Sequence, residues 1–303
     1  MWKKAITALI VVTCLLTLFL SFKAPLKSDV PEAEGSILGG GDVIGIVRVE
    51  GAISGQSSGG GLISQSASSL DQIMKALKAA QDRKDVKAVV VRVDSPGGTV
   101  AASQEIGEEI DKIRKMGKPV ICSMGDVAAS GGYWVASSCG TIMANPGTLT
   151  GSIGVIMEID NIEGLLQKLG VRSDVIKSGS FKDIGSMTRT MTPEERALLQ
   201  NMVMDSYNQF LTQVKKGRKG RIDEKQLVSL ADGRVFTGRQ AKSYGFVDML
   251  GDFPDAIAEA GKQAKMSKYD TVELNETDSF EELMSMFSTQ SMFSNSRLLK
   301  SVY

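Results

Sequence analysis

The stretch Asp126-Val127-Ala128-Ala129-Ser130-Gly131-Gly132-Tyr133-Trp134 follows an apolar run at 119–124 and sets one serine between small residues and two glycines. This pattern predicts a strand that stops, a tight turn, and a helix that begins at Ser130. Such a junction exposes a hydroxyl beside the free backbone N–H groups of a first helical turn. Ser130 is therefore a candidate nucleophile.

Strand and helix patterns alternate on both sides of this junction. The predicted strands are apolar, mostly β-branched runs at 43–49, 86–93, 119–124, 141–144 and 171–176. Helical spacing of apolar residues follows Ser69 as far as Leu77, and it recurs at Ile106, Ile110 and Ile113 before Gly117. A long helix is expected after Thr192 and Pro193, where Glu195 completes a capping box. The alternation with short connections predicts an α/β domain with parallel strands.

The two ends of the chain depart from this pattern. Lys3 and Lys4 precede an apolar segment at 5–22, which is about long enough at ~1.5 Å per residue to cross a bilayer core, and no small-x-small cleavage site follows. The Met- and Phe-rich stretch at 280–303 favours a flexible peptide, and our hypothesis is that it is self-inhibitory or self-processed. The expected division is a transmembrane signal anchor at 1–22, a linker at 23–42, the α/β domain at 43–265 and a C-terminal tail at 266–303.

Composition limits the chemistry. The 303 residues carry 35 basic and 35 acidic side chains, and this balance gives no sign of a nucleic-acid surface. The chain has no histidine, which excludes a Ser-His-Asp triad and metal sites that use histidine. We expect no cofactor and no metal. Cys14, Cys122 and Cys139 are not expected to form a disulfide framework, and a bond between the last two stays open as an alternative.

A serine hydroxyl needs an adjacent base to act as a nucleophile. Without histidine, that base is a carboxylate or a neutral lysine, and desolvation lowers a lysine pKa from about 10.4 toward ~7 to 8. Three glycine turns could assemble such a site: Pro96-Gly97-Gly98, Ser130-Gly131-Gly132 and Thr150-Gly151-Ser152. Two of them follow predicted strands, whose carboxyl ends collect ligand sites in open α/β sheets. Each signal alone also fits a structural turn, and Lys182 alone fits a solvated surface charge.

Five motifs taken together are more specific. They are Ser-Pro-Gly-Gly at 95–98, Ala-Ala-Ser-Gly-Gly-Tyr at 128–133, Leu-Thr-Gly-Ser-Ile-Gly-Val at 149–155, Lys-Ser-Gly-Ser-Phe-Lys-Asp at 177–183 and Ala-Asp-Gly-Arg-Val-Phe-Thr-Gly-Arg-Gln-Ala at 231–241. In this order they resemble the signal peptide peptidase A (protease IV) family in its short bacterial form. The resemblance implies a Ser-Lys dyad in which Ser130 is the nucleophile and Lys182 is the general base. It further implies an oxyanion hole made by Gly97 and Gly131, with Ser152 orienting the lysine amine.

The resemblance also implies a setting for the enzyme. It predicts a crotonase-like or Clp-protease-like α/β fold of repeated β-β-α units and a single-pass protein of the cell membrane with an extracytoplasmic catalytic domain. A homo-oligomer of about eight copies is expected, with cleaved signal peptides and other apolar peptides as substrates. Two alternative functions are an acyl-CoA hydratase or isomerase of the crotonase type, and a membrane scaffold that binds partners through its tail. Neither alternative needs Ser130 and Lys182 together, so their joint presence favours the peptidase.

Overall fold

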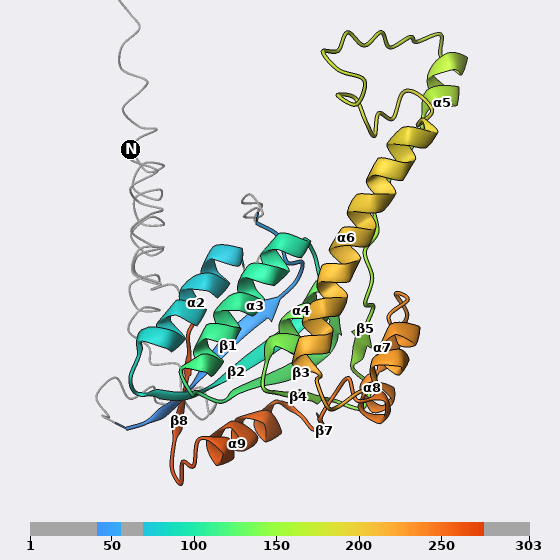
Figure 1. The fold of residues 1–303 in the computed structure, drawn as a ribbon. Helices are drawn as coiled ribbons and strands as arrows, with labels where there is room; N and C mark the ends of the chain where they lie inside the picture. Colours follow the sequence, from blue (N-terminus) through green and yellow to red (C-terminus); the bar gives the residue numbers. More distant parts are fainter. Residues whose placement is uncertain (1–40, 56–68, 276–303) are drawn as a thin grey trace, which may run out of the picture. The chain divides into compact units, whose positions relative to one another are not determined.

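The computed structural model describes residues 41–55 and 69–275 of the chain (Figure 1). All of them belong to the second of two compact units, Gly40–Tyr303. The predicted anchor at 1–22, most of the linker and the tail beyond 275 lie outside the described residues. Among the helices in the described ranges, none combines the length and apolarity needed to cross a membrane.

A mixed eight-stranded sheet forms the centre of this unit. Its long parallel strands are β1 (Val43–Glu50), β2 (Val86–Ser95) and β3 (Val120–Ala129). The shorter strands are β4 (Thr141–Ala144), β5 (Leu149–Gly151), β6 (Val235–Thr237), β7 (Met249–Leu250) and β8 (Asp270–Glu273). Both β4 and β5 pair with β3, β8 pairs with β1, and only the β5 to β6 pairing is antiparallel in the described sheet. The prediction of an α/β domain with parallel strands is confirmed.

Helices cover both faces of the sheet (Figure 1). Those that pack on one face are α2 (Leu70–Asp82), α3 (Val100–Lys115) and α4 (Gly131–Ser138), and α9 (Phe253–Gln263) packs on the other. The remaining helices are α5 (Glu163–Lys168), α6 (Pro193–Gly217), α7 (Glu224–Leu230) and α8 (Gly238–Tyr244). Successive residues of β2 face opposite sides, so Val89 and Val91 join the first core cluster and Val90 joins the second. This is why β2 is continuously apolar through its centre, from Ala88 to Val91.

Two strand assignments differ from the sequence-based expectation. Residues 171–176 are exposed and form no strand, so that prediction is wrong. Their apolar side chains, including the fully exposed Ile176, belong to the protein surface. Conversely, β8 lies in the stretch that the sequence assigned to the tail, where it pairs with β1 through register contacts such as Val43 with Asp270. Cys122 and Cys139 are buried free thiols, and burial raises the pKa of the Cys122 thiol.

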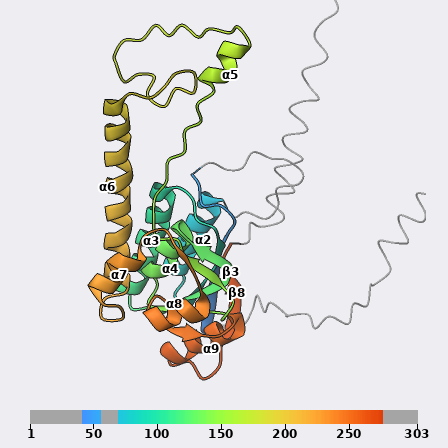
Figure 2. The ribbon, with the colours of Figure 1, turned by 90° about the vertical axis from the view of Figure 1, so that its right-hand side faces the viewer.

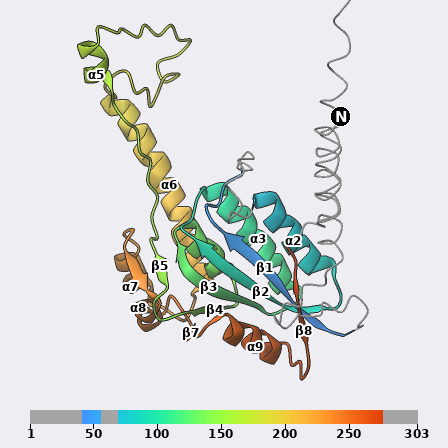
Figure 3. The ribbon, with the colours of Figure 1, turned by 180° about the vertical axis from the view of Figure 1, so that it is seen from behind.

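One segment extends away from the sheet. Residues 156–204, called the arm below, comprise α5, its flanking connections and the N-terminal half of α6, and all three ribbon views show them projecting from the α/β layers (Figures 1, 2 and 3). The C-terminal half of α6 is different, because Phe210, Leu211 and Val214 are buried in the main core. Helix α6 therefore joins the core at one end to the arm at the other.

Candidate active site

Ser130 lies at the junction that the sequence predicts. Strand β3 ends at Ala129, and Ser130 is the residue before α4, with φ +53° and ψ −121°. A positive φ in a residue other than glycine costs of order 1–3 kcal/mol and persists only where the surroundings impose it. Here the Ser130 N–H donates to the Gly151 carbonyl at 2.9 Å, and the Ser130 carbonyl accepts from the Trp134 N–H at 3.0 Å. The Ser130 side chain makes no capping hydrogen bond, which leaves its hydroxyl available for chemistry.

The register of the sheet brings the second hydroxyl to the same place. Strands β3 and β5 run parallel with Ala129 opposite Gly151, so the residues that follow them, Ser130 and Ser152, leave the sheet side by side. Ser152 also has a positive φ, +51°, and its N–H donates to the Arg234 carbonyl at 2.8 Å. Two strained serines thus stand at the carboxyl ends of two neighbouring strands, where α/β sheets collect ligand sites.

Gly97 lies directly behind the serine. A Cβ at position 97 would lie 2.7 Å from both Ser130 Cβ and the Gly131 nitrogen, and the φ of Gly97 is +103°. Only glycine fits this conformation and this approach. The Gly97 N–H donates to Ser95 Oγ at 3.1 Å, so a substrate oxyanion would have to replace that hydroxyl as the acceptor. Gly131 supplies a first-turn N–H of α4, the type of donor that helix starts leave unpaired.

A cleft of about 650 Å³ opens in front of these residues. Ser130, Gly131 and Ser152 supply polar groups to its wall. The larger side chains of the wall are apolar: Ile53, Val100, Trp134, Val155, Ile156 and Phe210. The rings of Trp134 and Phe210 stack with centroids 5.2 Å apart. Among the described residues that line the cleft, none carries an ionisable side chain, so this part of the wall offers serine hydroxyls and no side chain that could act as a base.

Lys182 is not one of the cleft residues. It is exposed and belongs to the connection between α5 and α6, within the arm. The arm carries this connection away from the sheet ends where Ser130 lies (Figures 1 and 3). The structure therefore brings together Ser130, Gly131 and Ser152, places Gly97 behind them, and leaves Lys182 apart from them in the single chain.

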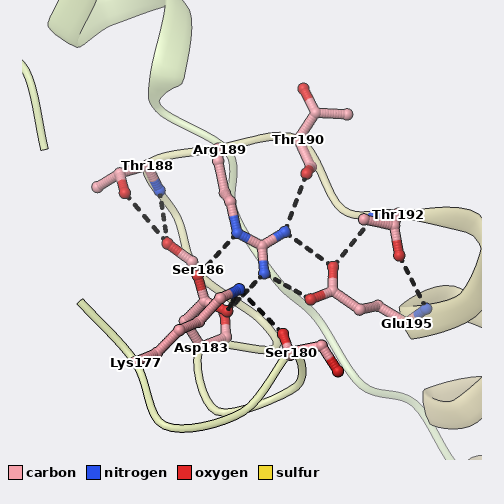
Figure 4. Close-up of polar contacts among 9 residues, drawn as sticks. All are labelled: Lys177, Ser180, Asp183, Ser186, Thr188, Arg189, Thr190, Thr192 and Glu195. Carbon is pink, nitrogen blue, oxygen red and sulfur yellow. Dashed lines mark hydrogen bonds and ion pairs between the residues drawn. The ribbon is translucent and has the colours of Figure 1, made fainter. Parts of the chain in front are cut away.

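Sequence reasoning missed an ion-pair cluster beside Lys182 (Figure 4). Arg189 contacts the carboxylates of Asp183 and Glu195, and Lys177 contacts Asp183. Hydrogen bonds from Arg189 and from the Thr192 backbone hold the pKa of Glu195 at about 2, and Arg189 and Lys177 hold the pKa of Asp183 well below its usual range. The sequence did reveal Glu195 as a capping residue, but no local pattern revealed its pairing with Arg189.

The described residues offer little for a metal. They contain no group of three or more His, Cys, Asp or Glu side chains placed to hold an ion. A second cavity, of about 400 Å³, lies between α3 and α6 and shares Trp134 with the cleft, but none of the predicted catalytic residues lines it. The polar groups that the described residues present to the cleft are hydroxyls and backbone groups.

Comparison with known proteins shows which family the chain belongs to. The family model described as peptidase family S49 matches residues 112–267, just over half of the 303 residues. The chain belongs to peptidase family S49. A Synechocystis sp. relative of this S49 chain is 46% identical over 203 residues, which cover 67% of the chain and 72% of the relative. Protease 4 of Salmonella typhi is 43% identical over 199 residues, covering 66% of the chain and 32% of that protein.

Two further matches are a plant protein and a solved structure. A chloroplastic serine protease of Arabidopsis thaliana is 36% identical over 233 residues, which are 76% of the S49 chain and 34% of the plant protein. Among solved structures, the 1510-N membrane-bound stomatin-specific protease matches with a TM-score of 0.49 and 15% identity, over 82% of this chain and 99% of that one. The S49 chain is a serine peptidase, and its resemblance to the signal peptide peptidase A (protease IV) family is confirmed. It matches about a third of the length of Protease 4.

Proposed function

We propose that this S49 peptidase cleaves peptides with a Ser-Lys dyad in which Ser130 of one copy of the chain is activated by Lys182 of a second copy. The observation that carries the proposal is the cleft, which contains a strained serine and no ionisable side chain among its described residues. A serine peptidase needs a base, and Lys182 is carried on an exposed arm that its own cleft does not include.

The surface of the arm supports a homo-oligomer. Large apolar side chains are exposed along it: Ile156, Met157, Leu165, Leu169, Val171, Val175, Ile176, Phe181, Met187, Leu198, Met202 and Met204. Clusters of exposed apolar side chains mark protein interfaces more often than single ones do. Phe181 directly precedes Lys182, so burial of this surface against a neighbour would bury the region of the lysine as well. The family resemblance suggests a ring of about eight copies.

The proposed reaction begins with proton transfer. A lysine amine in water is protonated at neutral pH, and removal of water on docking favours the neutral amine that a base requires. Neutral Lys182 Nζ takes the proton of Ser130 Oγ as that oxygen attacks the peptide carbonyl. The resulting oxyanion accepts hydrogen bonds from the N–H groups of Gly131 and Gly97, the latter released by Ser95 Oγ.

Collapse of the tetrahedral intermediate completes the acylation. The Lys182 ammonium gives its proton to the leaving amine, and an ester on Ser130 remains. Water, deprotonated by the same amine, then attacks the ester. The second tetrahedral intermediate collapses, the Lys182 ammonium returns the proton to Ser130 Oγ, and the carboxylic acid product leaves. The hydroxyl of Ser152, which lines the cleft, orients the amine throughout.

The substrate class follows from the walls of the cleft. Ile53, Val100, Trp134 and Phe210 favour apolar side chains. Remnants of cleaved signal peptides have this character, and a transmembrane anchor at 1–22 would hold an extracytoplasmic domain near them at the cell membrane. The alternation of parallel strands and helices, with glycine amides at the strand ends, supports a crotonase-like or Clp-protease-like arrangement.

A complementation experiment tests the shared dyad. Ser130→Ala and Lys182→Ala are each purified as the full chain in detergent and assayed on an apolar fluorogenic peptide, where both should be inactive. When the two variants are co-expressed, random assembly should restore activity at about a quarter of the sites, because each variant supplies the group that the other lacks. Activity in either single variant would exclude the proposed Ser-Lys dyad. Inactive mixed assemblies would show that Lys182 serves the serine of its own chain.

A further inference from the structure

The backbone around Lys182 is a series of turns. The Lys182 N–H donates to the Gly179 carbonyl at 3.1 Å, the Ile184 N–H to the Phe181 carbonyl at 3.1 Å, and the Ser186 N–H to the Asp183 carbonyl at 3.0 Å. In the described chain this stretch belongs to no helix or strand and its residues are exposed or half-buried. Isolated turns of this kind have little stability of their own. A lysine placed on them needs another contact to stay in one position.

Arg189 supplies that contact with one planar guanidinium (Figure 4). Its Nε and Nη2 donate to the two carboxylate oxygens of Asp183, each at 2.9 Å. Its Nη1 and Nη2 donate to the two carboxylate oxygens of Glu195, at 2.8 and 2.5 Å. Bidentate pairs of this type fix geometry as well as charge, and a lysine cannot replace them because its ammonium is a point charge.

The two carboxylates lie in very different surroundings. Asp183 directly follows Lys182 and is held from its other side by Lys177, whose Nζ donates to Asp183 Oδ1 at 2.6 Å. Glu195 belongs to the first turn of α6 and is 2% exposed. The Thr192 N–H donates to Glu195 Oε2 at 2.9 Å and the Glu195 N–H donates to Thr192 Oγ1 at 3.2 Å, so this carboxylate is fixed by a capping box. The guanidinium therefore ties the lysine turn to the start of a long helix.

We propose that Arg189 is the positioning residue of the general base: by bridging Asp183 and Glu195 it fixes the turn that carries Lys182 on the end of α6. This inference rests on the proposed dyad. Arg189 does not touch the substrate or the serine in this arrangement. Its effect is to hold Lys182 in one place before the second copy docks, so that little conformational freedom is lost when the base meets Ser130. A base misplaced by about 1 Å costs up to ~10²-fold in rate.

Arg189→Gln tests the inference. We expect kcat to fall about 10- to 100-fold while KM stays within about twofold, because Lys182 acts on the serine and does not hold the bound substrate. Arg189→Lys restores charge without the two-carboxylate bridge and should recover only part of kcat. Arg83→Gln is the matched control, because Arg83 makes the same bidentate contact with Asp85, at the end of α2, and its loss should leave kcat unchanged.

Two further measurements separate positioning from a general loss of structure. Amide hydrogen exchange should become faster at residues 179–186 in Arg189→Gln and stay unchanged in the sheet. The mass of the assembly, from light scattering, should equal that of the wild type. Wild-type kcat in Arg189→Gln, an equal loss in Arg83→Gln, or a loss of activity explained by failure to assemble would each overturn the inference. If Lys182→Ala keeps full activity, the dyad itself fails, which is a distinct result.

Discussion

Replacement of Gly97 by alanine should damage both stability and catalysis. The new Cβ would lie 2.7 Å from Ser130 Cβ, 2.7 Å from the Gly131 nitrogen and 2.9 Å from the Ala129 carbonyl oxygen. These atoms are backbone or the first carbon of the nucleophile, so no flexible side chain can move aside. Alanine at φ +103° adds backbone strain of about 1–2 kcal/mol, and forced packing adds about 1–3 kcal/mol. The free energy of unfolding should fall by about 2–5 kcal/mol in total.

Gly97→Ala should also lower kcat, and by more than partial unfolding of the variant would explain. Relief of the contact pushes apart Ser130 and the Gly131 N–H, which have to face the same carbonyl carbon and oxygen. Loss of one oxyanion donor alone costs about 10²- to 10³-fold in kcat. The assays are equilibrium urea unfolding, kcat on an apolar peptide, and the rate at which an activated-ester probe acylates Ser130.

Gly117→Ala is the control for Gly97→Ala. Gly117 also has a positive φ, +85°, but a Cβ there would meet nothing within 4 Å. Its replacement should therefore cost only the strain of about 1–2 kcal/mol, partly offset by the lower entropy of the unfolded chain, and should leave acylation unchanged. If Gly97→Ala is as stable as Gly117→Ala and is acylated at the wild-type rate, the close contact with the nucleophile is refuted.

Two further predictions concern buried charges. Arg218 is fully buried and pairs with Asp248 at 2.7 Å, so Arg218→Met should lower the free energy of unfolding in urea by about 3–5 kcal/mol because the carboxylate loses its main buried partner; a loss below about 1 kcal/mol would contradict this. The pKa of Glu195 is about 2 against an ordinary value near 4.5, so its contribution to stability is complete above that ordinary value and is lost as pH falls toward 2. Carboxyl carbon NMR should show this low titration in the wild type and a return toward the ordinary value in Arg189→Gln; a wild-type midpoint near 4.5 would exclude the ion pair.

Local hydrogen bonding made part of the fold predictable. Ser69 and Thr192 both form the capping boxes expected from their sequence, because each box joins residues only three positions apart. The turn at Ser130 was predictable for a similar reason, since the end of a strand and the start of a helix are adjacent in sequence. Parallel pairing followed from the alternation of strands and helices.

Non-local pairing set the limit of the prediction. The run at 171–176 has the apolar pattern of a strand, but a strand also requires a sheet edge, and none of the described strands pairs with it. Strand β8 shows the converse, because its acidic sequence gives no signal and its place is fixed by pairing with β1. The order of the motifs likewise predicted Ser130 and Lys182 as a pair. It could not show that Lys182 lies outside the cleft that Ser130 lines in the same chain.

Helix α6 connects the arm that carries Lys182, the proposed base, to Phe210 in the wall of the cleft. From Phe210 to its first residue, Pro193, the helix spans about 26 Å at ~1.5 Å per residue, so a tilt of about 2° at the core end moves the other end by about 0.9 Å. That displacement approaches the tolerance of a proton transfer. The core end of α6 is held by two packing contacts near the cleft. These are the stack of Phe210 on Trp134 and the burial of Val214. In the proposed shared dyad, a substrate side chain that displaces Phe210 would therefore shift the position of Lys182 relative to the serine of a second copy.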